Sequence, residues 1–161
     1  MISTLRLEPR IRKGELLAEG AFKTQRTFLD FIISGRSLLD AVADCEAVKP
    51  GVLDRMSVLA TDSVFITSSR EAVLRLLLQA PGDFPNNRRA LFICPECGDL
   101  GCGAISAVIE KVDATFVWRE FGYENNWEDG VQRDEYNALG PFVFSCEAYE
   151  NALREAHGRL P

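Results

Sequence analysis

Three of the chain's five cysteines lie close together in the sequence, as Cys94, Cys97 and Cys102. Thiolates two residues apart can hold a tetrahedral metal ion from a turn, and a structural zinc site usually has four cysteine or histidine ligands. The other two cysteines and the single histidine are distant in the sequence and form no second close pair. We therefore expect no bound cofactor, and we keep zinc held by Cys94, Cys97 and Cys102 as the alternative.

The residues around these cysteines argue against a thioredoxin-type dithiol. Such enzymes place the first cysteine at a helix N-terminus, which lowers the pKa of its thiol. Here Gly98, Gly101 and Gly103 follow at once, and glycine favours a tight loop over a helix. Cysteines that serve as small apolar core residues are a third interpretation. Catalysis through the single histidine, His157, is disfavoured because terminal positions fray.

The charge of the chain is unevenly distributed. Residues 1–95 hold 13 Lys/Arg and 11 Asp/Glu, a net of +2, whereas residues 96–161 hold 5 Lys/Arg and 13 Asp/Glu, a net of −8. An acidic half repels phosphate backbones, so we expect no direct binding of nucleic acid. It favours a basic protein partner through electrostatic steering. The alternative is an acidic surface that only keeps the chain in solution.

Aromatic and acidic residues alternate in the segment 119–136. Aromatic side chains can anchor an interface, and carboxylates around them steer and orient a basic partner. In the alternative interpretation the aromatic rings point inward and the acids face water. The expected partner-binding residues are Glu120, Tyr123, Glu124, Trp127, Glu128, Asp129, Asp134 and Glu135.

The elements that must position these residues follow from apolar periodicity and turn signals. We expect one domain over residues 1–161 with an α+β fold, in which about three helices pack on an antiparallel sheet. Alternation predicts a meander over residues 90–121, with strands at 90–94, 104–111 and 115–121. Further strands are expected at 5–11, at a sheet edge because of Pro9, at 27–33 and at 64–67. Residues 122–141 are expected to form a loop.

Capping residues predict where the helices begin. Ser37, Ser68 and Ser145 each precede an apolar pattern, and helices are expected from them to about 43, 79 and 156. The meander needs one apolar face against these helices. We therefore expect a buried set made of Phe92, Ile105, Ile109, Phe116 and Trp118.

The sequence shows no apolar leader and no uncharged run as long as a membrane span. Five cysteines without an export signal are expected to stay reduced. We expect a cytoplasmic protein that binds no membrane.

Four runs of sequence carry a resemblance: residues 94–104 (CPECGDLGCGA), 117–121 (VWREF), 140–144 (GPFVF) and the pattern Tyr149-x-x-Ala152-Leu153. They resemble a family of small bacterial cytosolic proteins, some of which carry an oxidoreductase label. In size, acidity and lack of a catalytic set, the chain is also similar to immunity proteins of contact-dependent growth inhibition and related toxin–antitoxin systems. That similarity implies a protein without catalysis of its own, which binds and neutralises a cognate basic toxin nuclease domain. A small zinc-binding or thiol-redox protein is the alternative.

Overall fold

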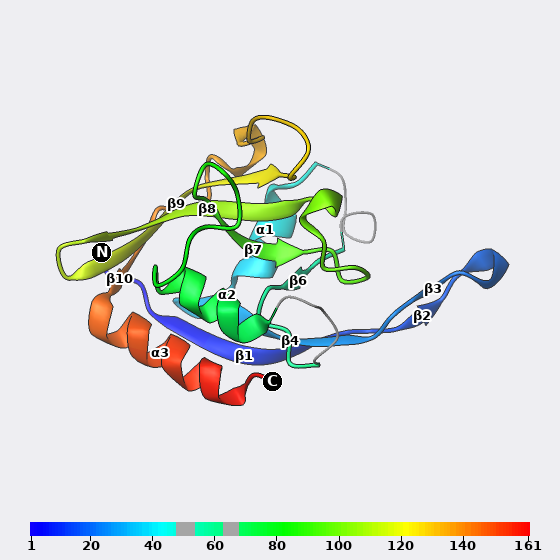
Figure 1. Ribbon diagram of the computed structural model, residues 1–161, viewed down its shortest axis with the longest axis horizontal. Coiled ribbons are helices and arrows are strands. Elements are labelled where there is room, and N and C mark those ends of the chain that lie inside the picture. Colours follow the sequence, from blue (N-terminus) through cyan, green and yellow to red (C-terminus); the bar gives the residue numbers. More distant parts are fainter. Residues whose placement is uncertain (48–53, 63–67) are drawn as a thin grey trace.

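The computed structural model describes residues 1–47, 54–62 and 68–161. Its larger sheet is an antiparallel meander with a strand added at each side (Figure 1). Its strand order is β10-β9-β8-β7-β6. The bounds are β6 Met56–Ser57, β7 Arg89–Ile93, β8 Ala104–Val112, β9 Thr115–Glu124 and β10 Phe142–Ser145. The predicted meander over residues 90–121 is confirmed.

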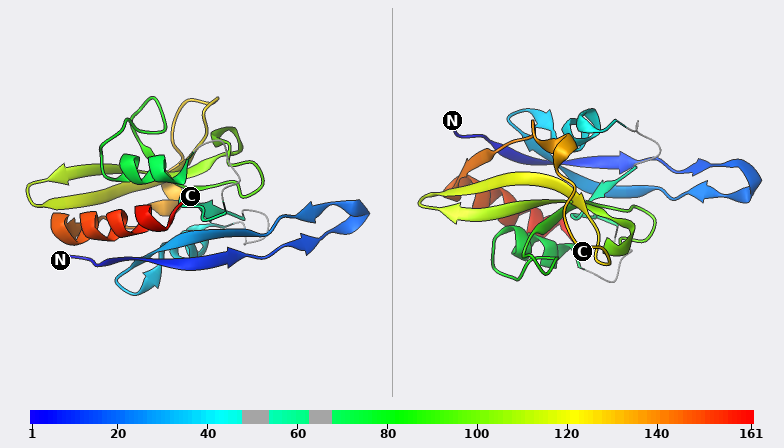
Figure 2. Two further views of the ribbon diagram at one scale, coloured as in Figure 1. Left: turned by 60° about the horizontal axis from the view of Figure 1, so that its bottom comes forward. Right: turned by 90° about the horizontal axis from the view of Figure 1, so that it is seen from above.

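A second sheet is built on a long hairpin from the N-terminal part of the chain. Strand β1 (Leu5–Arg12) pairs antiparallel with β4 (Arg26–Ile33), and β5 (Arg36–Ser37) pairs with the other side of β4. Strand β1 is an edge strand, as Pro9 predicted. Beyond this sheet the hairpin continues as an arm, in which β2 (Glu15–Leu16) pairs with β3 (Phe22–Lys23) around the 3₁₀ turn η1 (Ala18–Gly20). Figure 2 shows the arm projecting well beyond the rest of the molecule.

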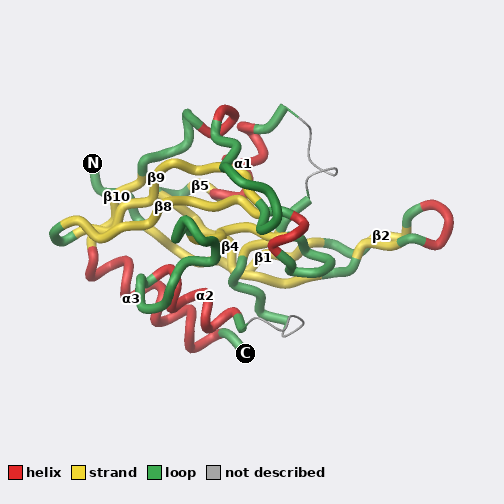
Figure 3. Tube along the Cα trace, turned by 45° about the horizontal axis from the view of Figure 1, so that its top comes forward, coloured by secondary structure: helices red, strands yellow, loops and turns green. Residues whose placement is uncertain are grey.

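Three α-helices occur in the described residues: α1 (Leu38–Cys45), α2 (Ser69–Leu76) and α3 (Cys146–Arg159). Each begins after the serine that the sequence predicted, because the Ser37, Ser68 and Ser145 hydroxyls accept the backbone N–H of Asp40, Arg70 and Ala148, respectively. Helix α3 lies between the two sheets at one end of the molecule, beside α2 (Figures 2 and 3). The α+β class is confirmed.

The two sheets share one core. Phe31 of β4 makes edge-on ring contacts with Phe92 of β7 and Trp118 of β9, at centroid distances of 5.8 and 5.4 Å. Tyr149 of α3 stacks on Phe116 at 4.3 Å. The whole predicted set is buried: Phe92, Ile105, Ile109, Phe116 and Trp118 are all at most 5% exposed. The single-domain organisation stays a prediction, which this shared core supports.

Several element boundaries were predicted wrongly. Helix α2 ends at Leu76 rather than 79, because Leu78 adopts a left-handed conformation (φ 60°) and Arg89 Nε donates to the Arg75 carbonyl near the helix end. Residues 122–124 extend β9 instead of starting the loop. Strand β10 was not predicted. The backbone of Phe142–Ser145 pairs antiparallel with β9 and so extends the sheet by one strand. The expected strand at 64–67 lies outside the described residues.

No helix among the described residues combines the length and the apolar character needed to cross a membrane.

Candidate functional site

The three clustered cysteines meet at one point, in the connection between β7 and β8. Their Sγ atoms all lie within 4.8 Å of one another, and Cys97 Sγ is 3.2 Å from Cys102 Sγ. Cys97 and Cys102 are exposed, and Cys94 is half-buried. The structure therefore does not support the interpretation of these cysteines as apolar core residues.

Local backbone bonds give this loop its shape. The Gly98 N–H donates to the Cys94 carbonyl at 2.9 Å, with Gly98 in the left-handed region (φ 64°). Asp99 then caps the 3₁₀ turn η2 (Leu100–Cys102) by accepting the Gly101 N–H at 2.7 Å. Gly103 (φ 92°) leads into β8, and a Cβ placed there would lie 2.3 Å from the ring of Tyr123. Glycine is needed at 103 for both reasons.

Backbone N–H groups point at two of the sulfur atoms. The N–H of Asp99 donates to Cys97 Sγ at 3.4 Å. Burial raises the pKa of Cys94, but hydrogen bonds from the backbone N–H groups of Cys97 and Glu96, and from the neighbouring thiols, outweigh burial and lower it. The hydrogen bond with Cys97 and burial raise the pKa of Cys102 to about 12. These hydrogen bonds therefore favour the thiolate form of Cys94 and the protonated form of Cys102 when no metal is bound.

The base of the projecting arm holds the cysteine loop in place. Glu96, between Cys94 and Cys97, accepts Arg12 Nη1 at 2.6 Å and the Thr24 N–H at 2.8 Å. Those bonds lower the pKa of Glu96 to about 2. Arg26 Nε donates to the Pro95 carbonyl at 2.7 Å. The loop is therefore fixed by side chains from the first 26 residues, far away in the sequence.

A cavity of about 730 Å³ opens beside the sulfur atoms, with Cys94 and Cys102 in its wall. Its wall carries four carboxylates and two guanidinium groups, so it is acidic overall. Deep in this wall, Arg55 Nη1 pairs with Glu46 Oε1 at 2.7 Å, and the Tyr136 hydroxyl donates to Glu46 Oε2 at 2.7 Å. A ligand in this cavity would lie next to any metal held by the cysteines.

Within the described part of the chain, the cysteine cluster offers three metal ligands. Among the described residues, no fourth His, Cys, Asp or Glu side chain lies within 4.8 Å of all three sulfur atoms. The segments 48–53 and 63–67 contain none of these residue types in the sequence. Three protein ligands and an open fourth position are typical of zinc sites that bind a water or a substrate, whereas structural sites are closed.

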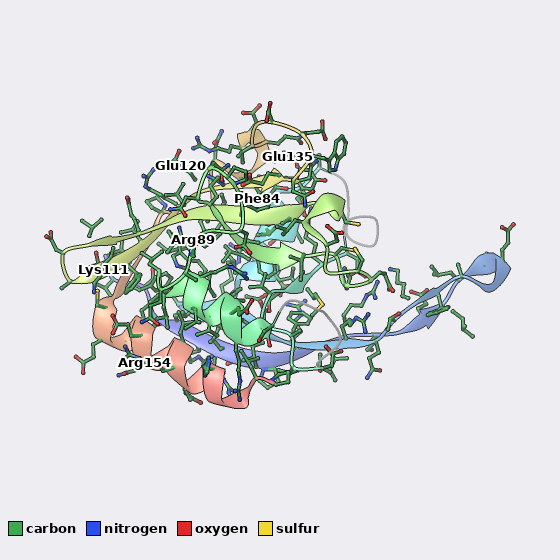
Figure 4. All side chains as sticks on the ribbon, in the orientation of Figure 1. Phe84, Arg89, Lys111, Glu120, Glu135 and Arg154 are labelled. Carbon is green, nitrogen blue, oxygen red and sulfur yellow. The ribbon has the colours of Figure 1, made fainter. Side chains whose placement is uncertain are left out.

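The predicted partner-binding residues divide between surface and interior. Trp127, Glu128, Asp129, Asp134 and Glu135 are exposed. Trp127 is 70% exposed, and its Nε1 donates to the Gly101 carbonyl at 3.0 Å, which places it beside the cysteine loop. In Figure 4, Glu120 and Glu135 lie along the upper part of the molecule, Lys111 lies at its left side and Arg154 at its lower left. We call the five exposed residues the acidic loop.

Three members of the predicted set do not belong to that free surface. Glu124 is only 5% exposed and pairs with the buried Arg88, Nε to Oε2 at 2.9 Å, so it cannot steer a partner. Glu120 is half-buried and pairs with Arg133 at 3.0 Å and with Arg119. Tyr123 is half-buried against Gly103 and lines the cavity. Tyr123 and Glu124 were expected in a loop that starts at residue 122. They lie on β9 instead, and this is why their side chains are not free on the surface.

Sequence reasoning missed the residues that support the cysteine loop. Arg12, Thr24 and Arg26 lie on the long hairpin, and nothing in their local pattern distinguishes them from solvated strand residues. Glu96 is the one residue of this network with a weak signal in the sequence. A carboxylate inside the turn between Cys94 and Cys97 can bind a donor from another segment of the chain.

Comparison of the chain with protein-family models, curated proteins and solved structures gave no match.

Proposed function

We propose that this protein binds a zinc ion through Cys94, Cys97 and Cys102, with a fourth coordination position open to the adjoining cavity. The observation that carries the proposal is the convergence of three Sγ atoms within 4.8 Å. Sulfur atoms bound at about 2.3 Å to a tetrahedral ion lie about 3.8 Å apart. The Cys97–Cys102 pair, at 3.2 Å, and the other pairs, at no more than 4.8 Å, each differ from that spacing by about an ångström or less.

The chemistry of the donors supports zinc over harder cations. Thiolates prefer soft or borderline metals such as Zn²⁺, while Mg²⁺ and Ca²⁺ prefer oxygen. The backbone N–H groups of Glu96, Cys97 and Asp99 offset the charge of the sulfur atoms. A cytoplasmic location, which is part of the proposal, would keep the thiols reduced and able to bind metal.

Elemental analysis of purified protein tests this proposal. We expect one zinc ion per chain, and we expect Cys94→Ser, Cys97→Ser and Cys102→Ser each to lose it or bind it at least tenfold more weakly, because each removes one of three ligands. Cys45→Ser and Cys146→Ser are matched controls, since both cysteines are half-buried and outside the cluster. Folded wild-type protein that stays zinc-free after reconstitution with excess Zn²⁺ would refute the proposal.

The acidic loop supports a second candidate function. We propose that it binds a basic partner protein, as in the immunity proteins that neutralise a basic toxin nuclease domain. The specific observation is Trp127, a large aromatic side chain that is 70% exposed among the carboxylates of Glu128 and Asp129. Exposed tryptophan is a typical interface anchor, and surrounding acids accelerate encounter with a basic surface.

The second candidate is tested by measuring binding kinetics with any basic toxin nuclease domain found to be encoded next to this gene. The variant Glu128→Lys/Asp129→Lys/Asp134→Lys should associate at least tenfold more slowly at low salt, because steering acts on encounter. Trp127→Ala should mainly speed dissociation. The control Lys111→Glu, on the far side, should change little. An unchanged association rate for the folded triple variant would exclude the acidic loop as the interface.

A further inference from the structure

Cys97 and Cys102 differ from the other cysteines in two ways. They are the two exposed cysteines of the five, and their Sγ atoms are 3.2 Å apart. Cys94 is half-buried, and backbone N–H groups of Glu96 and Cys97 hold its sulfur on the inner side of the loop. An oxidant arriving from solvent therefore meets Cys97 and Cys102 first.

We propose that Cys97 and Cys102 are a peroxide-reactive dithiol that forms a disulfide and thereby empties the metal site. The loss of the metal ion rests on the proposed zinc function. The formation of the disulfide needs only the two thiols. The oxidant is a hydroperoxide, with hydrogen peroxide as the simplest member.

The reaction balances in two steps. One thiol of the pair gives up its proton and attacks a peroxide oxygen as the thiolate. The O–O bond breaks, the sulfur becomes a sulfenic acid, and the leaving hydroxide, or the alkoxide from an organic peroxide, takes up that proton as water or an alcohol. The second thiolate attacks the sulfenic sulfur, the S–S bond forms, and hydroxide leaves and takes up a proton as water. Together the two thiols lose two electrons, and one peroxide molecule gains them.

The loop can close this bond locally. A disulfide needs the sulfur atoms at about 2.05 Å, so the 3.2 Å pair must approach by little more than an ångström. Gly98 and Gly101 lie between the two cysteines and allow backbone adjustment.

Closure affects both proposed functions of this region. Zinc loses two of its three thiolate ligands, and a single cysteine with solvent does not retain it. The backbone carbonyl of Gly101, inside the closing loop, accepts the Trp127 Nε1 hydrogen bond at 3.0 Å. Oxidation therefore alters the contact that holds the exposed tryptophan, so Trp127 reports on the state of the dithiol.

Titration of zinc-loaded protein with hydrogen peroxide tests the inference. We expect free thiols to fall from five to three, one peroxide to be consumed per chain, and one zinc to be released to a chromogenic chelator. Peptide mapping should give a single disulfide, Cys97–Cys102. The fluorescence of Trp127, measured as the difference between wild type and Trp127→Phe, should change with the same time course and recover on reduction.

Cysteine variants separate the dithiol proposal from the zinc proposal. Cys94→Ser should still form the Cys97–Cys102 disulfide although its metal site is incomplete, and Cys45→Ser and Cys146→Ser should respond as the wild type. A disulfide in zinc-free wild-type protein would support the dithiol even if the zinc proposal failed. Zinc-binding protein whose mapped disulfide includes Cys94, or whose thiols go to sulfinic acid without any disulfide, would overturn the inference and leave the zinc proposal standing.

Discussion

Replacing Trp118 with alanine should lower the free energy of unfolding by about 3–5 kcal/mol, the range for truncating a large buried aromatic side chain. Trp118 is 0% exposed and makes edge-on contacts with Phe31 and Phe144, both at 5.4 Å. Its Nε1 donates to the Tyr149 hydroxyl at 3.0 Å. The substitution removes contacts with both sheets and with α3 and leaves a buried hydroxyl with one partner fewer.

Chemical denaturation measures this effect, with the second tryptophan as matched control. Trp127→Ala removes the same side chain from a site that is 70% exposed, so the free energy of unfolding should change by less than about 0.5 kcal/mol. Equal destabilisation by the two substitutions would contradict the arrangement of β9 in the core.

Replacing Glu124 with alanine should also lower the free energy of unfolding by about 3–5 kcal/mol, because removal of one partner leaves a buried charge unpaired. Arg88 Nε donates to Glu124 Oε2 at 2.9 Å and to Ser106 Oγ at 3.0 Å, and Asn86 Nδ2 donates to Glu124 Oε1 at 3.0 Å. Burial lowers the pKa of Arg88, and the hydrogen bond with Glu124 acts against it. In Glu124→Ala the guanidinium keeps only neutral partners.

Two comparisons identify the cause of this loss. Glu128→Ala, four residues on and exposed, should change the free energy of unfolding by less than about 0.5 kcal/mol. The double variant Arg88→Met/Glu124→Leu should recover a large part of the loss, because replacing a buried ion pair by apolar residues of similar size is often neutral. If Glu124→Ala melted like the wild type, the pair would not be buried in solution.

The sequence by itself determined the parts of the fold that depend on local chemistry. Alternating apolar residues over 90–121 required one buried sheet face, so Phe92, Phe116 and Trp118 were assigned to the core correctly. Serine caps at 37, 68 and 145 set the helix starts because the bond to the backbone N–H is made within three residues. The spacing of Cys94 and Cys97 likewise defined a loop that can present thiolates.

Only the tertiary structure decided which charged groups face water and what surrounds the cysteines. Glu124 looks like its neighbour Glu128 in the sequence, yet it is buried because Arg88, directly before β7, reaches it across the sheet. Cys102 approaches Cys97 because η2 folds the loop back, and Arg12, Thr24 and Arg26 hold that loop from the other sheet. These contacts join residues that are distant in the chain, and their energies depend on burial, which no local pattern specifies.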